Sequence, residues 1–259
     1  MLRSRAAAHE VGHSPHFRWR GGEVSRLEGF SDAVLGFALT LLVVSLDMPE
    51  NFDELLQAMR GFPAFAVCFA LLVQIWYRHY LFFRRYGLQD ALTTTLNAVL
   101  LFVLLFYVYP LKFLFTLVLG AEAYAARIRP QQVSLLFTIY GAGMMAVFGV
   151  LALLHVHAYR RRDRLDLNEI EVLDTRLTIR HDVLYVLIGA ISIIVANVVP
   201  GHYVGLAGWC YALIGVAEFV HNYRGGRQRE RVIASMAGPP AAADPSETAG
   251  AAPAGATQT

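Results

Sequence analysis

A short stretch near the start of the chain has the residue types and spacing of a zinc-protease motif. His9, Glu10 and His13 spell HEVGH, in which two histidines one helical turn apart bind the metal and the glutamate acts as the base. The surrounding segment is polar, and Gly12 weakens any helix that would bring the histidines together. Adventitious metal binding, with His16 close by, is the favoured alternative to catalysis. We therefore predict no enzyme, no metal site and no cofactor.

A second stretch, TIYGAG from Thr138 to Gly143, is similar to the TVGYG loop whose backbone carbonyls form an ion filter. It lacks the glycine before the tyrosine, and it lies inside a continuous apolar run instead of a re-entrant loop. Small residues also allow two membrane helices to approach closely. Close helix packing is therefore the prediction for this stretch.

A third set of polar residues directly precedes a long apolar run. From Ala33 to Leu46 the chain carries no charge, and Ser31 and Asp32 stand at its start. Both residue types cap helices, and a bilayer does not readily accept them. Other polar residues near the ends of apolar runs are predicted to be interfacial, with their polar tips in the headgroup region: Asn197, His155, His157, Glu218 and His221.

The composition indicates a membrane protein. Hydrophobic residues make up 56% of the 259 residues, charged residues make up 16%, and the mean hydropathy is +0.45. A net charge of +2, spread among apolar blocks, does not suit a nucleic-acid surface. The two cysteines lie in apolar segments, so they predict neither a disulfide framework nor a metal cage.

Six apolar blocks are each near the ~20 residues that a bilayer requires. Of the 22 Lys and Arg residues, 18 fall in the two terminal segments and in alternate loops, so both termini are predicted to be cytoplasmic, with the protein in the inner (plasma) membrane. The loop between the fourth and fifth blocks could hold a short amphipathic helix, although a solvated loop is an equal alternative. The blocks cover residues 30–48, 61–80, 92–118, 132–158, 183–199 and 203–221.

Polar and low-complexity segments lie on either side of these blocks. Residues 1–24 are predicted to form a disordered cytoplasmic arm because they show no periodicity. Residues 224–259 are predicted to form a disordered cytoplasmic tail, since their Ala, Pro and Gly tract has too little bulky apolar surface to order. The six-span domain is then residues 25–223.

The first apolar block has an ordered pattern of its own. At 100° per residue, its larger side chains form one stripe and its small residues form an edge beside it. The stripe either faces a pore or packs against other spans of the same chain, and periodicity alone favours packing. The stripe is Ala33, Phe37, Leu41, Val44 and Met48, and the edge is Gly29, Gly36 and Thr40.

The sequence around this block resembles the transmembrane protein 175 potassium channel family. Arg26, Phe30, Ser31 and Asp32 match that family's R-x-x-x-F-S-D signature. Later landmarks of the family are similar over residues 26–110: Trp76 and His79 as W-x-x-H, then Asn97 and Pro110.

The resemblance implies a passive potassium-selective channel: an all-α membrane protein of six transmembrane helices that assembles with itself as a homotetramer in the lipid bilayer. The first helix would line the pore, where Phe37, Leu41 and Val44 form a hydrophobic constriction and gate in place of a carbonyl filter, with Thr40 as the adjacent polar site. Relatives usually carry isoleucine or leucine at the innermost ring, where this chain has Phe37. Potassium ions are the expected partner, and no nucleic acid is expected.

The signature residues would anchor the first helix. Ser31 and Asp32 would accept hydrogen bonds at the helix start, with Trp76, His79 and Asn97 as a supporting polar network. If His79 pairs with Asp32, channel opening depends on pH, because histidine titrates near neutrality. The alternative function is a proton-coupled or other secondary transporter that uses Asp32 and His79.

Overall fold

Long helices make up nearly all of the described chain. The computed structural model describes residues 17–44, 50–119, 130–199 and 206–237, and these residues contain helices and no strand. The predicted all-helical fold class is confirmed for them. The helices are α2 (Arg26–Val44), α3 (Phe52–Arg60), α4 (Phe62–Tyr86), α5 (Ala91–Leu119), α7 (Pro130–Arg160), α8 (Glu169–Val198), α9 (Leu206–Trp209), the 3-10 turn η2 (Cys210–Ala212) and α10 (Leu213–Ala237).

Four of these helices are long and apolar enough to cross a membrane. They cover Phe62–Tyr86, Ala91–Leu117, Gln132–Arg160 and Glu169–Val198, each longer than the ~20 residues that a bilayer requires. The protein is therefore a multi-pass membrane protein.

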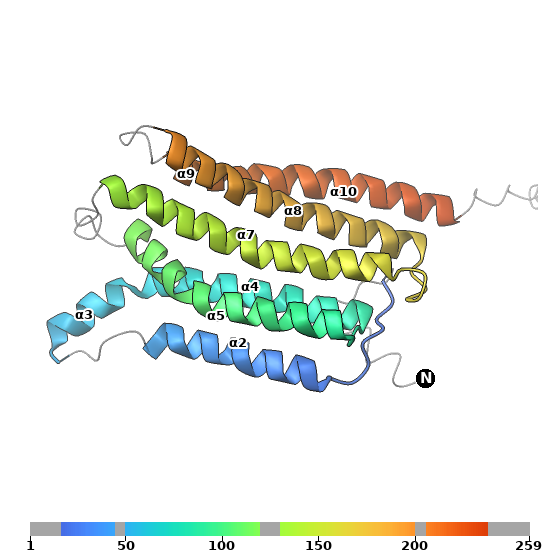
Figure 1. Ribbon diagram of the computed structural model, residues 1–259, viewed down its shortest axis with the longest axis horizontal. Coiled ribbons are helices and arrows are strands. Elements are labelled where there is room, and N and C mark those ends of the chain that lie inside the picture. Colours follow the sequence, from blue (N-terminus) through green and yellow to red (C-terminus); the bar gives the residue numbers. More distant parts are fainter. Residues whose placement is uncertain (1–16, 45–49, 120–129, 200–205, 238–259) are drawn as a thin grey trace, which may run out of the picture.

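The helices pack side by side along one common direction (Figure 1). Packing begins with α2, which lies on both α4 and α5, continues through α7 to α8, and ends with α10 on α8. The helix α2 is thus at one edge of the bundle and α10 is at the other. As a consequence, α2 is covered by its own chain on one face only.

Local capping sets the ends of two central helices. The last turn of α4 carries Arg84 and Arg85, whose positive charges suit the carbonyl end of a helix, and Gly87 then adopts a left-handed φ of 59°. At the start of α8, the Asn168 side chain accepts from the Glu171 amide while the Glu171 carboxylate accepts from the Asn168 amide.

Because of this capping box, α8 begins earlier than the fifth predicted block. The sequence prediction started it at residue 183, whereas α8 begins at Glu169. The amphipathic helix considered for the preceding loop is therefore the first part of α8 itself. Hydropathy missed it because this part is rich in charged residues; three of its carboxylates are paired with arginines of other segments, Glu171 with Arg20, Asp174 with Arg229 and Asp182 with Arg78.

The stretch TIYGAG lies within α7, and its predicted role in close packing is confirmed. A Cβ atom added to Gly141 would lie 2.9 Å from the carbonyl oxygen of Gly189 on α8, and one added to Gly143 would lie 2.1 Å from the Tyr107 ring. Any larger residue would therefore push α7 away from its neighbours.

The terminal segments differ from their predicted disorder where the structure describes them. The amides of Arg20 and Gly21 both donate to the Arg84 carbonyl oxygen at 3.0 Å, so residues 17–24 lie against the end of α4. At the other end, α10 continues to Ala237, past the predicted start of the tail at residue 224. The HEVGH stretch lies outside the described residues.

Candidate functional site

One face of α2 packs into its own subunit. Glu28, Ser31, Leu35, Ala38 and Leu42 are buried, and their alternating spacing of three and four residues places them on one side of the helix. Leu35, Ala38 and Leu42 join the same apolar core as buried residues of α4 and α5. This face fixes α2 to the rest of the bundle.

The opposite face of α2 is uncovered. Phe30, Phe37 and Leu41 are 60%, 67% and 56% exposed. A Cβ atom added to Gly29 or Gly36 would meet nothing within 4 Å. The alternative in which the stripe packs against other spans of the same chain is therefore wrong for Phe37 and Leu41.

The other residues of the predicted stripe and of its small-residue edge are only partly described by the structure. Ala33 and Thr40 are exposed, and the Thr40 hydroxyl donates to the Phe37 carbonyl oxygen at 2.8 Å. The backbone of Val44 closes α2, but its side chain lies outside the described part, as does all of Met48. The exposed surface thus runs along α2 at least as far as Leu41.

A buried polar network joins α2, α4 and α5. The Asn97 amide nitrogen donates to the Ser31 hydroxyl at 2.8 Å, and the Asn97 carbonyl oxygen lies 2.7 Å from Nε2 of His79. The Ser31 hydroxyl donates in turn to the Leu27 carbonyl oxygen at 2.8 Å. Because Ser31, His79 and Asn97 are all at most 2% exposed, these bonds are shielded from water. The structure therefore brings together three of the predicted anchoring residues.

The other two predicted anchoring residues, Asp32 and Trp76, bond to each other. The Trp76 indole nitrogen donates to the Asp32 carboxylate at 2.8 Å. His79 bonds to Asn97 and Asp32 to Trp76, so the His79–Asp32 pair, which was the condition for pH-dependent opening, does not form here. The reason is positional: Ser31 points into the subunit, whereas Asp32 is exposed beside Trp76 at the surface.

The cap of α2 is also earlier than predicted. The Ser25 hydroxyl accepts from the Glu28 amide at 3.2 Å, and the Glu28 carboxylate accepts from the Ser25 amide at 3.1 Å. Ser31 and Asp32 therefore lie one turn inside the helix and do not cap it. Arg26 is exposed four residues before Phe30, so these two signature residues share the uncovered face.

The far end of α2 has a positive partner from α5. The Lys112 ammonium donates to the Leu42 carbonyl oxygen at 3.2 Å, which places a positive charge at the carbonyl end of the helix. Beside this contact, a crevice of about 280 Å³ lies between α2 and α5 and is lined in part by Leu41 and Tyr109.

A second polar cluster, which the sequence analysis missed, lies away from α2. Asp182 on α8 is fully buried, forms an ion pair with Arg78 of α4, and lies 3.0 Å from Nδ1 of His155 on α7. Nearby, Glu218 of α10 accepts from the Tyr185 hydroxyl at 2.6 Å and also bonds to the His181 ring.

Two histidines that were predicted to be interfacial are buried against carboxylates instead. His155 is buried against Asp182, and His157 is buried against Asp90 at 2.8 Å, so neither extends its tip toward water. Asp182 was missed because the predicted span began one residue after it. The capping pattern of Asn168 and Glu171 was the signal that would have extended the helix back across it.

Comparison with known proteins gives consistent matches. The family model described as "Endosomal/lysosomal potassium channel TMEM175" matches residues 26–107, which include the uncovered face of α2 and the Ser31, His79 and Asn97 network. A protein of Marivirga tractuosa named potassium channel is 42% identical over 201 residues, covering 73% of this chain and 81% of that protein. A potassium channel of Chamaesiphon minutus is 28% identical over 112 residues, covering 40% of this chain and 55% of that protein.

A solved structure matches the fold of this chain over most of the chain's length. It is a crystal structure of a variant of the potassium channel MtTMEM175 in complex with a nanobody-MBP fusion protein, and it aligns with a TM-score of 0.74 at 38% identity. The match covers 84% of this chain and all of the solved chain.

Proposed function

Since this chain belongs to the TMEM175 family of potassium channels, we propose that it is a passive, potassium-selective cation channel of the inner (plasma) membrane. The pore is lined by α2 in a homotetramer. A hydrophobic constriction on α2 takes the place of a carbonyl filter.

The single observation that carries the proposal is the uncovered face of α2. It combines large apolar side chains, Phe37 and Leu41, with glycines that have open space around them. A face turned to lipid has no need of glycines, whereas a helix that meets another helix closely does. Gly29 with Ala33, and Gly36 with Thr40, form two small-xxx-small pairs on this face. We therefore assign this surface to contacts between subunits and to the pore.

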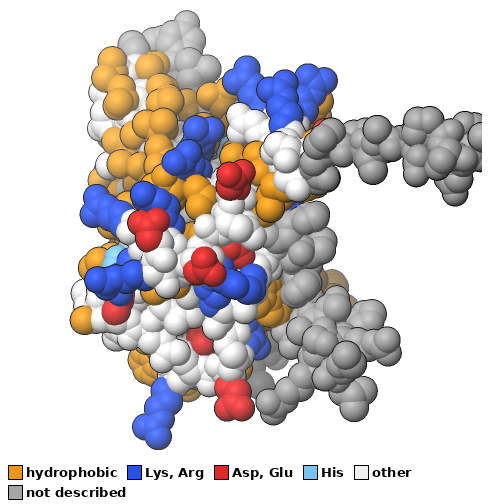
Figure 2. Space-filling view, turned by 90° about the vertical axis from the view of Figure 1, so that its right-hand side faces the viewer, with side chains coloured by type: hydrophobic (Ala, Val, Ile, Leu, Met, Phe, Trp, Pro, Cys, Tyr) orange, Lys and Arg blue, Asp and Glu red, His pale blue; other side chains and the backbone are white. Residues whose placement is uncertain are grey.

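The topology of the proposal has six spans. They are the four long apolar helices together with α2 and α10, which run along the same direction (Figure 1). An even number of spans places both termini on one side, and the distribution of Lys and Arg makes that side the cytoplasm. Figure 2 supports this orientation, because Lys and Arg side chains gather with acidic ones at the end of the bundle where α4, α7 and α10 finish. Residues 25–223 are proposed as the core of the channel domain, which residues 17–24 extend at one end by packing on α4, and which α10 extends at the other end as far as Ala237.

Selectivity follows from the chemistry of the constriction. Rings of Phe37, Leu41 and Val44 offer no oxygen ligands, so a passing ion must shed part of its water. Potassium loses water more readily than sodium because its charge is spread over a larger ion. A ring of this kind also gates by dewetting. Phe37 additionally offers aromatic faces to a cation, and Thr40 supplies a hydroxyl beside the ring.

The polar network holds α2 in the position that this mechanism needs. Ser31 and Asp32 receive hydrogen bonds from α5 and α4, respectively. These bonds fix the rotation of α2 about its own axis. Phe37 is therefore kept on the side opposite to the buried face.

Recording from purified protein in planar bilayers tests the function. With unequal K⁺ concentrations on the two sides and Na⁺ making up the difference, we expect unitary currents that reverse close to the K⁺ equilibrium potential. Bilayers treated with the same detergent without protein are the control. Slow electroneutral flux without unitary events would contradict the channel and support the secondary transporter.

A further inference from the structure

Two adjoining cavities lie in the half of the subunit farthest from α2. The first has a volume of about 620 Å³ and is bounded by α4, α8 and α10, with His155 of α7 at its base. The second has a volume of about 710 Å³ and is bounded mainly by α4, α5 and α7, with further residues from α8, α9, η2 and the start of α10. Both volumes are in the range of small-molecule and cofactor pockets. Gln74 and Arg78 of α4 line both cavities, so the two cavities lie on either side of these side chains.

The two cavities differ in chemistry. The second is lined almost wholly by apolar and aromatic side chains, such as Leu111, Met144 and Trp209. The first has arginines, histidines and carboxylates from four helices, α4, α7, α8 and α10, in its lining. A ligand that fills both must therefore have one apolar part and one polar part.

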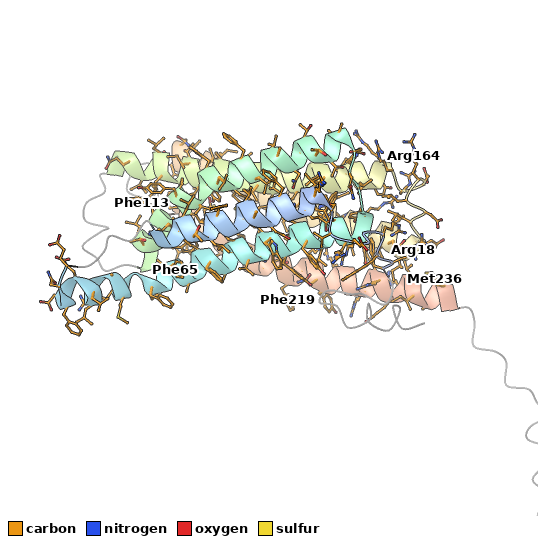
Figure 3. All side chains as sticks on the ribbon, turned by 90° about the horizontal axis from the view of Figure 1, so that it is seen from below. Arg18, Phe65, Phe113, Arg164, Phe219 and Met236 are labelled. Carbon is orange, nitrogen blue, oxygen red and sulfur yellow. The ribbon has the colours of Figure 1, made fainter. Side chains whose placement is uncertain are left out.

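The position of the cavities along the helices matches the layers of a bilayer. Arg78, Asp182 and Glu218 lie where the apolar runs of α4, α8 and α10 give way to charged residues. The polar cavity is thus at the level of lipid headgroups, and the apolar cavity extends from it into the hydrocarbon layer. Figure 3 shows the charged end by its labelled residues: Arg18, Arg164 and Met236 lie there, whereas Phe65 and Phe113 lie toward the other end.

The charges of the polar cavity favour an anion. Its two carboxylates already have partners in the subunit: Asp174 pairs with Arg229 at 3.1 Å, and Glu218 bonds to His181 and Tyr185. Arg78 is likewise paired, with Asp182.

Arg85 is the exception among these cations. Within the described residues it forms no ion pair, its Nε atom is buried without a hydrogen-bond partner, and its guanidinium lies 4.9 Å from the Phe17 ring centroid. A guanidinium with free donors matches the oxygens of a phosphate group. The surplus positive charge of the cavity is therefore on the residue best suited to bind phosphate.

We propose that this pair of cavities binds one anionic phospholipid of the cytoplasmic leaflet. Its phosphodiester lies against Arg85 in the polar cavity, and an acyl chain passes Gln74 and Arg78 into the apolar cavity. Basic pockets between helices on the cytoplasmic side are suited to acidic lipid headgroups. The lipid fills the space between α4 and α10, and so stabilises the edge of the subunit opposite to α2. This inference rests on membrane residence and on the cytoplasmic orientation given under the proposed function, but not on ion conduction, so the two can fail separately.

Thermal unfolding of the purified full-length protein in detergent tests the proposal. Phosphatidylglycerol is expected to raise the unfolding temperature by several degrees at saturation, because a ligand that binds only the folded state stabilises it. Phosphatidylcholine and inorganic phosphate are expected to give much smaller shifts. An equal rise in unfolding temperature with phosphatidylcholine would show that the headgroup charge does not contribute to binding. An equal rise with inorganic phosphate would show a simple anion site. Either result overturns the proposal.

Three variants localise the effect. Arg85→Gln removes the phosphate contact and Leu136→Trp fills the apolar cavity, and each should raise the half-saturating concentration of phosphatidylglycerol at least fivefold. Arg164→Gln makes the same charge change on an exposed residue at the same end and should leave it unchanged. An unchanged concentration in both cavity variants would overturn the site.

A second measurement does not depend on how well the variants fold. Native mass spectrometry of the wild-type protein with equal amounts of both lipids should show one retained phosphatidylglycerol per chain. No retained lipid, or no preference between the two, would overturn the proposal.

Discussion

Replacing Asn97 with alanine is expected to destabilise the subunit, because this side chain joins α5 to both α2 and α4. The change removes two buried hydrogen bonds, to His79 at 2.7 Å and to Ser31 at 2.8 Å. Ser31 keeps its bond to the Leu27 carbonyl oxygen, whereas the Nε2 atom of His79 loses the one hydrogen bond that it makes within the described residues. The cost therefore falls mainly on His79.

The size of the effect lies between two limits. A buried polar group without a partner costs about 1–3 kcal/mol, while hydrogen bonds between membrane helices average about 0.6 kcal/mol each. With two bonds lost and one group left unpaired, we expect about 1.5–3 kcal/mol for Asn97→Ala. For a protein of this size that loss lowers the unfolding temperature by roughly 3–12 °C.

Tryptophan fluorescence during heating of the detergent-solubilised protein measures the change. Asn197→Ala is the matched control, because its amide also joins two helices, through Ser134 and Thr138 of α7, but is exposed to solvent, so its loss should shift the transition by only about 1 °C. An Asn97→Ala transition within 1 °C of the wild type would refute the idea that the network anchors α2.

Further substitutions test other parts of the account. Gly36→Leu adds bulk to the uncovered face of α2, so we expect light scattering to show loss of the tetramer; an unchanged mass would argue against that interface. Gly141→Leu must separate α7 from α8, where even a Cβ atom lies 2.9 Å from the Gly189 carbonyl oxygen, and should lower the unfolding temperature by at least about 5 °C. Asp182→Asn leaves Arg78 and His155 without their charged partner and should cost about 3–5 kcal/mol in denaturant titration. Near-wild-type stability in either of the last two would contradict the packing or pairing that we describe.

The sequence predicted the helical class, the apolar blocks and the stripe on the first helix. These follow from local composition and a 3.6-residue period, which need no knowledge of neighbours. Periodicity could not say where the stripe faces, because lipid, another helix and a pore can all accept Phe37 and Leu41. Only packing of the rest of the bundle shows that these two side chains remain uncovered.

Pairing between distant residues was beyond the sequence. The resemblance selected Ser31, Asp32, Trp76, His79 and Asn97, but not which of them bond to one another. His79 and Asp32 look like a titrating pair by residue type, yet they bond to different partners. Ser31 and Asp32 are neighbours on α2, and neighbouring side chains on a helix diverge by about 100°, so only Ser31 points into the network of His79 and Asn97.

Buried charges misled hydropathy in a similar way. A charged residue usually marks the end of an apolar run, so Asp182 was placed outside the fifth block. In the fold its charge is compensated by Arg78 of α4, and the ring of His155 from α7 lies 3.0 Å away. Pairing between charges on different helices leaves no local pattern in the sequence. The capping box at the start of α8 does leave one, and it marks the helix that contains Asp182.

The central claim is that the uncovered face of α2 lines the ion path, and Phe37→Ala tests it most directly. The ring is 67% exposed in the subunit, so its removal should leave the subunit fold intact. Single-channel conductance in planar bilayers should rise at least about tenfold, which corresponds to lowering the barrier by about 1.4 kcal/mol. Phe106→Ala removes an equally exposed ring from α5 and should leave conductance unchanged. Unchanged conductance in Phe37→Ala would contradict the claim that this face of α2 lines the pore.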